Sequence, residues 1–337
     1  MSITELGRTG ADPATDLAVR AEGLVKTFGT HRAVDGIDLD VRTGEIFGVL
    51  GPNGAGKTTT LRMLATLLNI DAGRAEIFGV DVAANPHVIR QLVGVTGQYA
   101  SVDENLTARE NLWLFSRLQG IPASRARNIA VDLLGQFGLE EAADKPISQF
   151  SGGMRRRLDL AASLITRPPL IFLDEPTTGL DPRTRGQMWE TIRGLVASGC
   201  TVLLTTQYLD EADQLADRVA VIDHGRKVAE GTPDELKTAV GNSALQLLLA
   251  DPDEVPAAAE VVRRVLGSDP VLSPERGRLN VALDQADQAA DVLIALRTAG
   301  VSITSVSVAK PSLDEVFLAL TGHETDSHDE TPMEDGR

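Results

Sequence analysis

The chain has 337 residues, of which 42% are apolar and 24% charged, an ordinary composition for a globular protein long enough to form two domains. Its 32 basic and 48 acidic residues give a net charge of −16, which argues against general nucleic-acid binding, because affinity for phosphate backbones comes largely from clustered Lys and Arg. The single cysteine, Cys200, excludes a disulfide framework and a multi-cysteine metal site.

Neither a secretory signal nor a membrane span is predicted. Residues 1–16 are polar, and no stretch approaches the roughly 20 consecutive apolar residues that cross a bilayer. We therefore expect an intracellular chain that reaches a membrane only through a partner.

The larger, amino-terminal part of the chain alternates between β-rich and amphipathic segments. We expect strands at Leu17–Val25, Ile37–Val41, Glu45–Leu50, Arg74–Phe78, Leu92–Val95, Leu170–Leu173, Thr201–Thr205, Arg218–Ile222 and Lys227–Glu230. Helices are expected from Lys57, after Ser151, and at Ala108–Leu118, Ser124–Phe137 and Arg183–Ala197. Thr107 and Glu110 have the spacing of a capping box. Strands separated by helices indicate a parallel sheet with crossover connections.

A smaller αβ pattern follows a composition shift near residues 239–242. It predicts strands at Leu245–Leu249, Leu279–Leu283 and Ile303–Val308, and helices at Val255–Leu266, Gln285–Ala299 and Leu313–Leu320. The apolar face of the last helix, which follows Ser312, predicts either a contact with a partner or the core of its own domain. We thus expect a flexible stretch over 1–17, a main domain over 18–240 that is mostly helical over about 100–168, an accessory domain over 241–322, and a disordered acidic tail over 323–337.

The strongest motif is a glycine-rich turn between an apolar strand and a helix. It reads Gly51-Pro52-Asn53-Gly54-Ala55-Gly56-Lys57-Thr58, followed by Thr59, and matches the phosphate-loop pattern. The glycines let backbone N–H groups turn toward phosphate oxygens, and the helix N-terminus adds partial positive charge. We expect Lys57 to reach the β- and γ-phosphates of a nucleotide and Thr58 to bind Mg²⁺.

Two carboxylates follow the apolar strand at Leu170–Leu173. They are Asp174 and Glu175, and the carboxyl end of a buried strand is where α/β sheets bind ligands. Asp174 suits the Mg²⁺ shell, and Glu175 suits polarising a water that attacks the γ-phosphate. Two acids in a solvated loop are the alternative, and the phosphate loop upstream argues against it.

Three further segments are weak signals when each is taken alone. Ser151, Gly152 and Gly153 precede a helix rich in arginine and form either a plain N-cap or an anion site. Gln98 follows a strand and a glycine, and Asp181 lies shortly after the acid pair. We expect Arg155–Arg157 to form a solvated or subunit-facing helix surface.

In this order the motifs resemble those of the ATP-binding cassette (ABC) transporter ATPases, over about residues 18–232. The resemblance implies a P-loop ABC nucleotide-binding domain with a mixed sheet core, an antiparallel β subdomain and a helical subdomain, joined to a small α+β accessory domain. It implies an Mg²⁺-dependent ATPase with ATP and Mg²⁺ as cofactors, and head-to-tail pairing with a second copy of itself.

The resemblance also implies roles for single residues. Lys57 and Thr58 would bind phosphates and Mg²⁺, Asp174 would hold Mg²⁺ through water, and Glu175 would be the general base. Gln98 would sense the γ-phosphate and Mg²⁺ and link to the membrane partner. Ser151, Gly152 and Gly153 would cap the γ-phosphate of the ATP on the second copy, and Asp181 would lie in the dimer contact. Phe28 would stack on adenine, with core packing as an equal alternative.

Several stretches, including Gly97–Glu104, Ser151–Leu158, Thr205–Ala212 and Ser312–Leu318, resemble the daunorubicin/doxorubicin-resistance ATP-binding proteins as far as about Gly322. Those proteins energise a separate permease that exports anthracyclines. The resemblance implies the motor subunit of a two-component exporter conferring antibiotic resistance, peripheral on the cytoplasmic face of the bacterial plasma membrane. The permease would bind the drug.

Three positions depart from the family pattern. Phe150 and Met154 flank Ser-Gly-Gly where most cassettes have Leu and Gln, and Gln207 stands where most have His. Gln207 keeps a donor and an acceptor but no charge, so we expect it to sense the γ-phosphate while hydrolysis is slower. A neutral loop residue is the alternative. Export of another natural product and a slow-turnover soluble ATPase remain open, whereas a nucleic-acid cassette is disfavoured because such proteins usually carry two cassettes.

Overall fold

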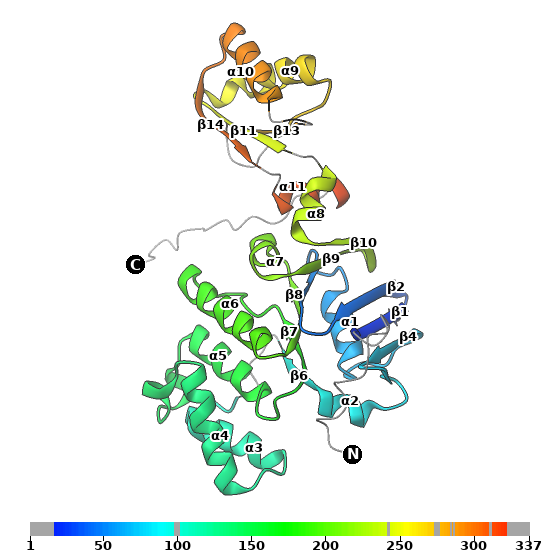
Figure 1. Ribbon diagram of the computed structural model, residues 1–337, viewed down its shortest axis with the longest axis vertical. Coiled ribbons are helices and arrows are strands. Elements are labelled where there is room, and N and C mark those ends of the chain that lie inside the picture. Colours follow the sequence, from blue (N-terminus) through cyan, green and yellow to red (C-terminus); the bar gives the residue numbers. More distant parts are fainter. Residues whose placement is uncertain are drawn as a thin grey trace. The chain divides into compact units, whose positions relative to one another are not determined.

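The computed structural model describes residues 17–97, 102–240, 243–272, 277–283, 285, 287–309 and 312–321. The chain forms two compact units, residues 1–230 and 231–337 (Figure 1). The second unit begins before the composition shift that predicted a boundary between residues 240 and 241. Most of the predicted flexible N-terminus and the whole acidic tail lie outside the described residues, and the first strand begins at Leu17.

A six-stranded sheet forms the centre of the first unit. Its strands are β3 (Ile46–Leu50), β6 (Val93–Thr96), β7 (Leu170–Asp174), β8 (Thr201–Thr206), β9 (Arg218–Asp223) and β10 (Arg226–Gly231), in the order β10-β9-β3-β8-β7-β6. The pairs from β9 to β6 are parallel, as predicted. Every residue of β3, β7 and β8 is buried, which explains why these strands are continuous apolar runs rather than alternating ones.

The parallel register brings the ends of these strands together. Leu50 lies opposite Thr206, and Asp174 lies opposite Thr205. The loops that follow β3, β7 and β8 therefore emerge at one edge of the sheet, where α/β proteins bind ligands.

A second sheet is antiparallel and has four strands in the order β2-β1-β4-β5. The strands are β1 (Leu17–Phe28), β2 (His31–Arg42), β4 (Ala72–Ile77) and β5 (Val80–Asp81). Helix α1 (Lys57–Leu64) contacts strands of both sheets, and one apolar core joins the helix to the two sheets. The core fixes the helix that begins at Lys57.

Helices α3 (Ala108–Leu118), α4 (Ala123–Gln136) and α5 (Gly152–Ser163) pack together as a helical subdomain (Figure 1). The 3₁₀ turns Glu140–Ala142 and Ile147–Gln149 lie between α4 and α5. The predicted capping box is present: Glu110 N donates to Thr107 Oγ1 at 3.2 Å, and Thr107 N donates to the Glu110 carboxylate at 2.8 Å.

The remaining helices of the first unit are α2 (Pro86–Leu92), α6 (Pro182–Ala197) and α7 (Leu209–Leu215). Helix α6 contacts β8 and α5, and α7 contacts β3 and β8. Helices α2 and α7 each have only seven residues, too few for a clear 3.6-residue period, and the sequence did not predict them.

The second unit contains an antiparallel sheet in the order β12-β13-β11-β14. Its elements are α8 (Pro233–Val240), β11 (Ser243–Leu249), the 3₁₀ turn Pro252–Glu254, α9 (Val255–Leu266), β12 (Val271–Leu272), β13 (Arg278–Leu283), α10 (Gln288–Thr298), β14 (Ile303–Ala309) and α11 (Leu313–Thr321). Side chains of β11, β13, α9 and α10 form its main core, so the predicted small α+β domain is present.

Helix α11 packs against α8 within this unit. Leu313, Val316 and Phe317 are buried, whereas Leu320 is 42% exposed. The apolar face of the last helix therefore serves mainly the core of its own unit, which was one of the two alternatives. Over the part of the chain that is described, none of the helices has the length and apolar character that crossing a membrane requires.

Candidate active site

A cavity of about 300 Å³ lies at the glycine-rich turn between β3 and α1. It is lined by Phe28, His31, Ala33, Asn53, Gly54, Gly56, Lys57, Thr58, Thr59 and Glu175. The phosphate loop, the predicted general base and the predicted adenine contact thus share one cavity.

The turn can close only because of its glycines. Gly56 has a φ of +103°, and a Cβ on it would lie 2.4 Å from the carbonyl oxygen of Ala33. Ala55 N donates to Pro52 O at 3.2 Å, so the turn is held by its own main chain. Helix α1 begins directly afterwards, and its first N–H groups face an incoming anion with partial positive charge.

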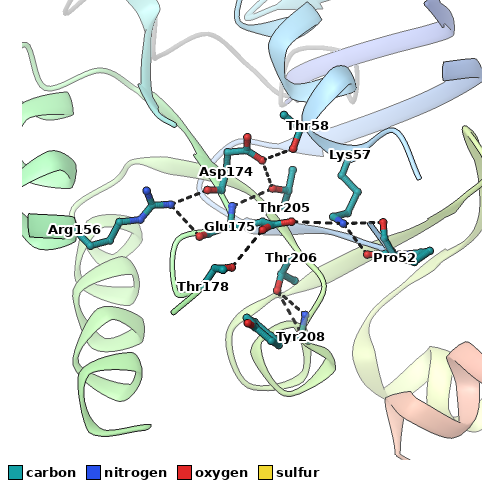
Figure 2. A network of polar contacts seen from close by, with 11 residues as sticks. Pro52, Lys57, Thr58, Arg156, Asp174, Glu175, Thr178, Thr205, Thr206 and Tyr208 are labelled. Atoms are coloured by element: carbon teal, nitrogen blue, oxygen red, sulfur yellow. Dashed lines mark hydrogen bonds and ion pairs between the residues drawn. The ribbon is translucent and has the colours of Figure 1, made fainter. Parts of the chain in front are cut away.

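Lys57 is buried at the centre of this turn, with 3% of its surface exposed. Its Nζ donates to Gly51 O at 2.7 Å and to Pro52 O at 3.0 Å, and lies 3.7 Å from Glu175 Oε1 (Figure 2). Burial lowers the pKa of Lys57, and the neighbouring carboxylates of Glu175 and Asp174 partly oppose that shift. The ammonium group is thus placed at the phosphate loop. Phosphate oxygens of a bound nucleotide would replace the main-chain carbonyl oxygens, which are weaker acceptors, as its hydrogen-bond partners.

Asp174 is buried and accepts hydrogen bonds from two hydroxyl groups. Thr58 Oγ1 donates to Asp174 Oδ1 at 2.8 Å, and Thr205 Oγ1 donates to the same oxygen at 2.7 Å (Figure 2). A hydroxyl and a carboxylate oxygen side by side, beside a phosphate loop, are the donor set of an Mg²⁺ that also binds nucleotide phosphates. These residues therefore fit a magnesium site. The sequence missed Thr205, because its contact depends on strand register.

Glu175 is nearly buried and has a φ of +49°, in the left-handed region that non-glycine residues rarely adopt. Such strain costs about 1–3 kcal/mol and is typical of functional sites. Its N–H donates to Thr205 O and Oγ1, both at 3.1 Å, and Thr178 Oγ1 donates to its Oε2 at 3.3 Å. The carboxylate faces Lys57 and the cavity, so the acids are not a solvated pair (Figure 2).

The three arginines of α5 do not form one solvated surface, so that prediction was wrong for Arg156. Its guanidinium donates to the carbonyl oxygens of Asp174 at 2.7 Å and Glu175 at 2.9 Å. Arg155 instead pairs with Glu104, and Arg157 donates to Phe137 O. The sequence pattern did not single out the middle arginine.

Ser151 and Asp181 are the N-caps of α5 and α6. Met154 N donates to Ser151 Oγ at 3.3 Å, and Thr184 N donates to Asp181 Oδ1 at 3.0 Å. The Thr184 hydroxyl also donates to Asp181, and these bonds lower the pKa of its carboxyl group. Gly153 is buried where the two helices meet.

A Cβ on Gly153 would lie 2.2 Å from Thr184 Cγ2, whereas Gly152 faces open space. Ser151, Gly152, Gly153 and Asp181 are not among the described residues that line the cavity. Gly153 therefore has a packing role within the chain, whereas Ser151 and Gly152 are exposed at its surface.

The other predicted residues are placed as follows. Gln207 is half-buried and directly follows β8, one residue after Thr206, at the same sheet edge as the phosphate loop. Phe28 is 47% exposed and lines the cavity, with Lys26 Nζ 5.7 Å from its ring centre, so it is not a core residue. Gln98 lies outside the described residues.

The buried carboxyl group of Glu211, on the helix that follows β8, predicts that the stability of the protein depends on pH. Glu211 on α7 is fully buried; its Oε1 accepts hydrogen bonds from Thr177 and Trp189, while its Oε2 has no hydrogen-bond partner among the described residues. Burial raises the pKa of Glu211 above its ordinary value of 4.5. Between the pKa of this group in the unfolded chain and its raised pKa in the folded chain, the folded chain keeps a proton that the unfolded chain has lost. Glu211 therefore makes the protein less stable as the pH rises from the lower of these two values to the higher.

Glu211→Gln removes the cost of a buried negative charge. We expect the melting temperature of the variant to exceed that of the wild type by more at pH 8 than at pH 5. Thermal unfolding at both pH values measures it, with Asp210→Asn, an exposed acid on the same helix, as the control. A difference between variant and wild type that is equal at both pH values would contradict the expectation.

Two protein-family models match the chain: "ABC transporter" at residues 34–178, and "ATP-binding protein DrrA1-3-like, C-terminal domain" at residues 231–321. The daunorubicin resistance ATP-binding protein DrrA2 of Streptomyces coeruleorubidus is 51% identical over 92% of this chain and 97% of its own length. The daunorubicin/doxorubicin resistance ATP-binding protein DrrA of Streptomyces peucetius is 53% identical over 92% of this chain and 94% of its own.

A solved dimeric ATP-binding cassette in a post-hydrolysis state, bound to ADP and Pi, is 25% identical and superposes with a TM-score of 0.59 over 64% of this chain and 98% of that one. These matches confirm the predicted fold class, which the two sheets and the helical subdomain also show. The chain is therefore an ATP-binding ABC transporter ATPase and belongs to the DrrA family of daunorubicin-resistance ATP-binding proteins.

Proposed function

We propose that the chain is the motor subunit of a two-component exporter that expels a hydrophobic antibiotic such as daunorubicin or doxorubicin. The observation that carries this is the identity of 51% and 53% to two resistance proteins over nearly the whole chain, including the carboxyl-terminal unit. The drug itself would be bound by the permease.

The hydrolytic step follows from the side chains around the cavity. Lys57 binds the β- and γ-phosphates, and Phe28 stacks on the adenine ring. Glu175 takes a proton from the water whose oxygen attacks the γ-phosphorus as the bond to the ADP oxygen breaks. Thr58 and Asp174 would hold Mg²⁺, which would supply positive charge to the phosphate oxygens.

A second copy of the chain completes the site. Ser151 and Gly152 are exposed at the N-terminus of α5 and away from the cavity of their own chain, which supports contact with ATP on a partner. The dimeric cassette with ADP and Pi among the structural relatives supports the same arrangement. Asp181, exposed at the start of α6, would lie in that contact, and Gln98 would connect the site to the permease.

Mixing two inactive variants tests the shared site. Lys57→Met removes the phosphate-binding ammonium group, and Ser151→Arg blocks the start of α5. Both ATP sites are therefore inactive in a homodimer of either variant. A mixed head-to-tail dimer has one intact site, and random mixing restores at most about a quarter of wild-type ATP turnover. Turnover that stays at the level of the separate variants would contradict the shared site.

The permease places the chain on the cytoplasmic face of the plasma membrane as a peripheral subunit. Expression of the chain with the permease that copurifies with it should raise the daunorubicin concentration that a sensitive bacterium tolerates. The Glu175→Gln chain should not. Equal protection by both would show that ATP hydrolysis at this site does not drive resistance.

Gln207 affects the rate of ATP hydrolysis. We expect Gln207→Ala to lower ATP turnover about tenfold, the equivalent of one lost hydrogen bond. Gln207→His should raise turnover, because it restores a side chain that can carry charge. Steady-state phosphate release measures both. A Gln207→Ala rate equal to that of the wild type would make Gln207 the neutral loop residue.

A further inference from the structure

The guanidinium of Arg156, on α5, is bonded to main-chain oxygens. Nη2 donates to Asp174 O at 2.7 Å and to Glu175 O at 2.9 Å (Figure 2). Nε donates to Pro176 O at 3.1 Å. Nη1 donates to the carbonyl oxygen of Gly97, which follows the end of β6. One cation thus holds four carbonyl groups from two neighbouring strand ends.

Three of these carbonyls are consecutive, and they belong to the turn that carries Glu175. They converge because the backbone at Glu175 is left-handed. Three converging carbonyl dipoles repel one another unless a cation or N–H groups lie between them. The guanidinium of Arg156 therefore stabilises the backbone conformation that directs the Glu175 carboxylate toward Lys57.

The same side chain ties α5 to this turn. The helix has Ser151 at its N-cap, and Arg156 lies between that end and the buried Leu160. Strands β6 and β7 pair in parallel, so Gly97 and the Asp174–Pro176 turn lie side by side. A displacement of α5 that breaks these bonds releases both strand ends together.

The four carbonyl oxygens require a planar guanidinium group at this position. Arginine offers five N–H donors in fixed directions, whereas lysine offers three on one nitrogen. Burial lowers the pKa of Arg156, and the acidic groups of Asp159, Asp174, Glu211 and Glu175 partly oppose that shift.

We propose that Arg156 is a positioning residue for ATP hydrolysis, which fixes the turn bearing Glu175 and makes its geometry depend on the position of α5. This rests on the proposed role of Glu175 as the general base. The prediction is that replacing Arg156 slows the chemical step without weakening ATP binding.

The test compares Arg156→Lys with Arg155→Lys in the full-length protein. Arg155 undergoes the same chemical change on the same helix, but its partners are Glu104 and the Ser148 carbonyl. We expect Arg156→Lys to lower kcat about 100-fold, the cost of misplacing a reacting group by about 1 Å. The Kd for ATP and the melting temperature should stay close to those of Arg155→Lys.

A kcat of Arg156→Lys within twofold of the wild type would overturn the proposal, as would a loss of kcat that is matched by an equal loss of ATP affinity. Glu175→Gln run in parallel separates the two ideas. If it keeps its turnover, the role of Glu175 is wrong; if it loses turnover while Arg156→Lys does not, only the role of Arg156 is wrong.

Arg156→Ala adds a readout that a structural role would not give. Free guanidinium at millimolar concentration should occupy the vacated space and raise its kcat several-fold, with no such rise for Glu175→Gln. Absence of rescue in a folded Arg156→Ala protein would count against the proposal. If that variant does not fold, Arg156→Lys alone decides.

Discussion

Glu175→Gln is expected to lower ATP turnover about 100- to 10,000-fold, the usual contribution of a positioned general base. Glutamine keeps the size of the side chain and can accept the hydrogen bond from Thr178, but it cannot take a proton from water. The negative charge near Lys57 is lost at the same time, so the phosphates no longer compete with a carboxylate for its ammonium group. ATP binding should therefore be retained.

Single-turnover phosphate release and ATP binding measure the two effects separately. Glu190→Gln, the same change at an exposed position on α6, is the control and should behave as the wild type. Turnover of Glu175→Gln above about a tenth of the wild-type rate would show that another group, or water alone, accepts the proton.

Lys57→Ala is expected to weaken ATP binding about 100-fold, because a charge-assisted hydrogen bond to phosphate contributes about 1.5–3 kcal/mol and Lys57 is placed to make more than one. Its Nζ donates hydrogen bonds to Gly51 O and Pro52 O, which are neutral acceptors. Phosphate oxygens carry full charge and form the stronger bonds. ATP turnover should fall with binding.

Calorimetric titration of ATP measures the affinity, and thermal unfolding shows that the variant is folded. Lys145→Ala changes an exposed lysine of the helical subdomain and should leave affinity unchanged. An ATP affinity of Lys57→Ala within threefold of the wild type would mean that the phosphates do not lie against this loop.

The sequence predicts local features of this molecule well and contacts between distant segments poorly. The phosphate loop and the capping box at Thr107 are short patterns whose residues contact one another directly, and both are where they were expected. Strands β3, β7 and β8 were predicted because they are buried on both faces and so remain apolar throughout.

Contacts that depend on register could not be predicted in the same way. Thr205 reaches Asp174 only because β7 and β8 pair with those two residues opposite each other. Arg156 is a second case, because helical spacing does not separate it from Arg157, which also lies within four residues of the buried Gly153 and Leu160. The bonds of Arg156 to the Asp174–Pro176 turn depend on how α5 lies against that turn, which is a contact between distant segments.

Strand lengths in the antiparallel sheet also exceeded the prediction. Strand β2 begins at His31 rather than Ile37, and β1 continues to Phe28. The ladder between them has register shifts, which break the alternation of buried and exposed residues on which the prediction relied. The extra length matters, because it carries Phe28 and His31 to the nucleotide cavity.

ATP-driven uptake of daunorubicin into inverted membrane vesicles that contain the chain and its permease tests the proposed export function most directly. The wild-type chain should accumulate the drug when MgATP is added, and the Glu175→Gln chain should not, although both bind ATP. Equal accumulation by the two chains, or none by a wild-type chain that hydrolyses ATP in the same vesicles, would contradict the proposal that this site powers export of the drug.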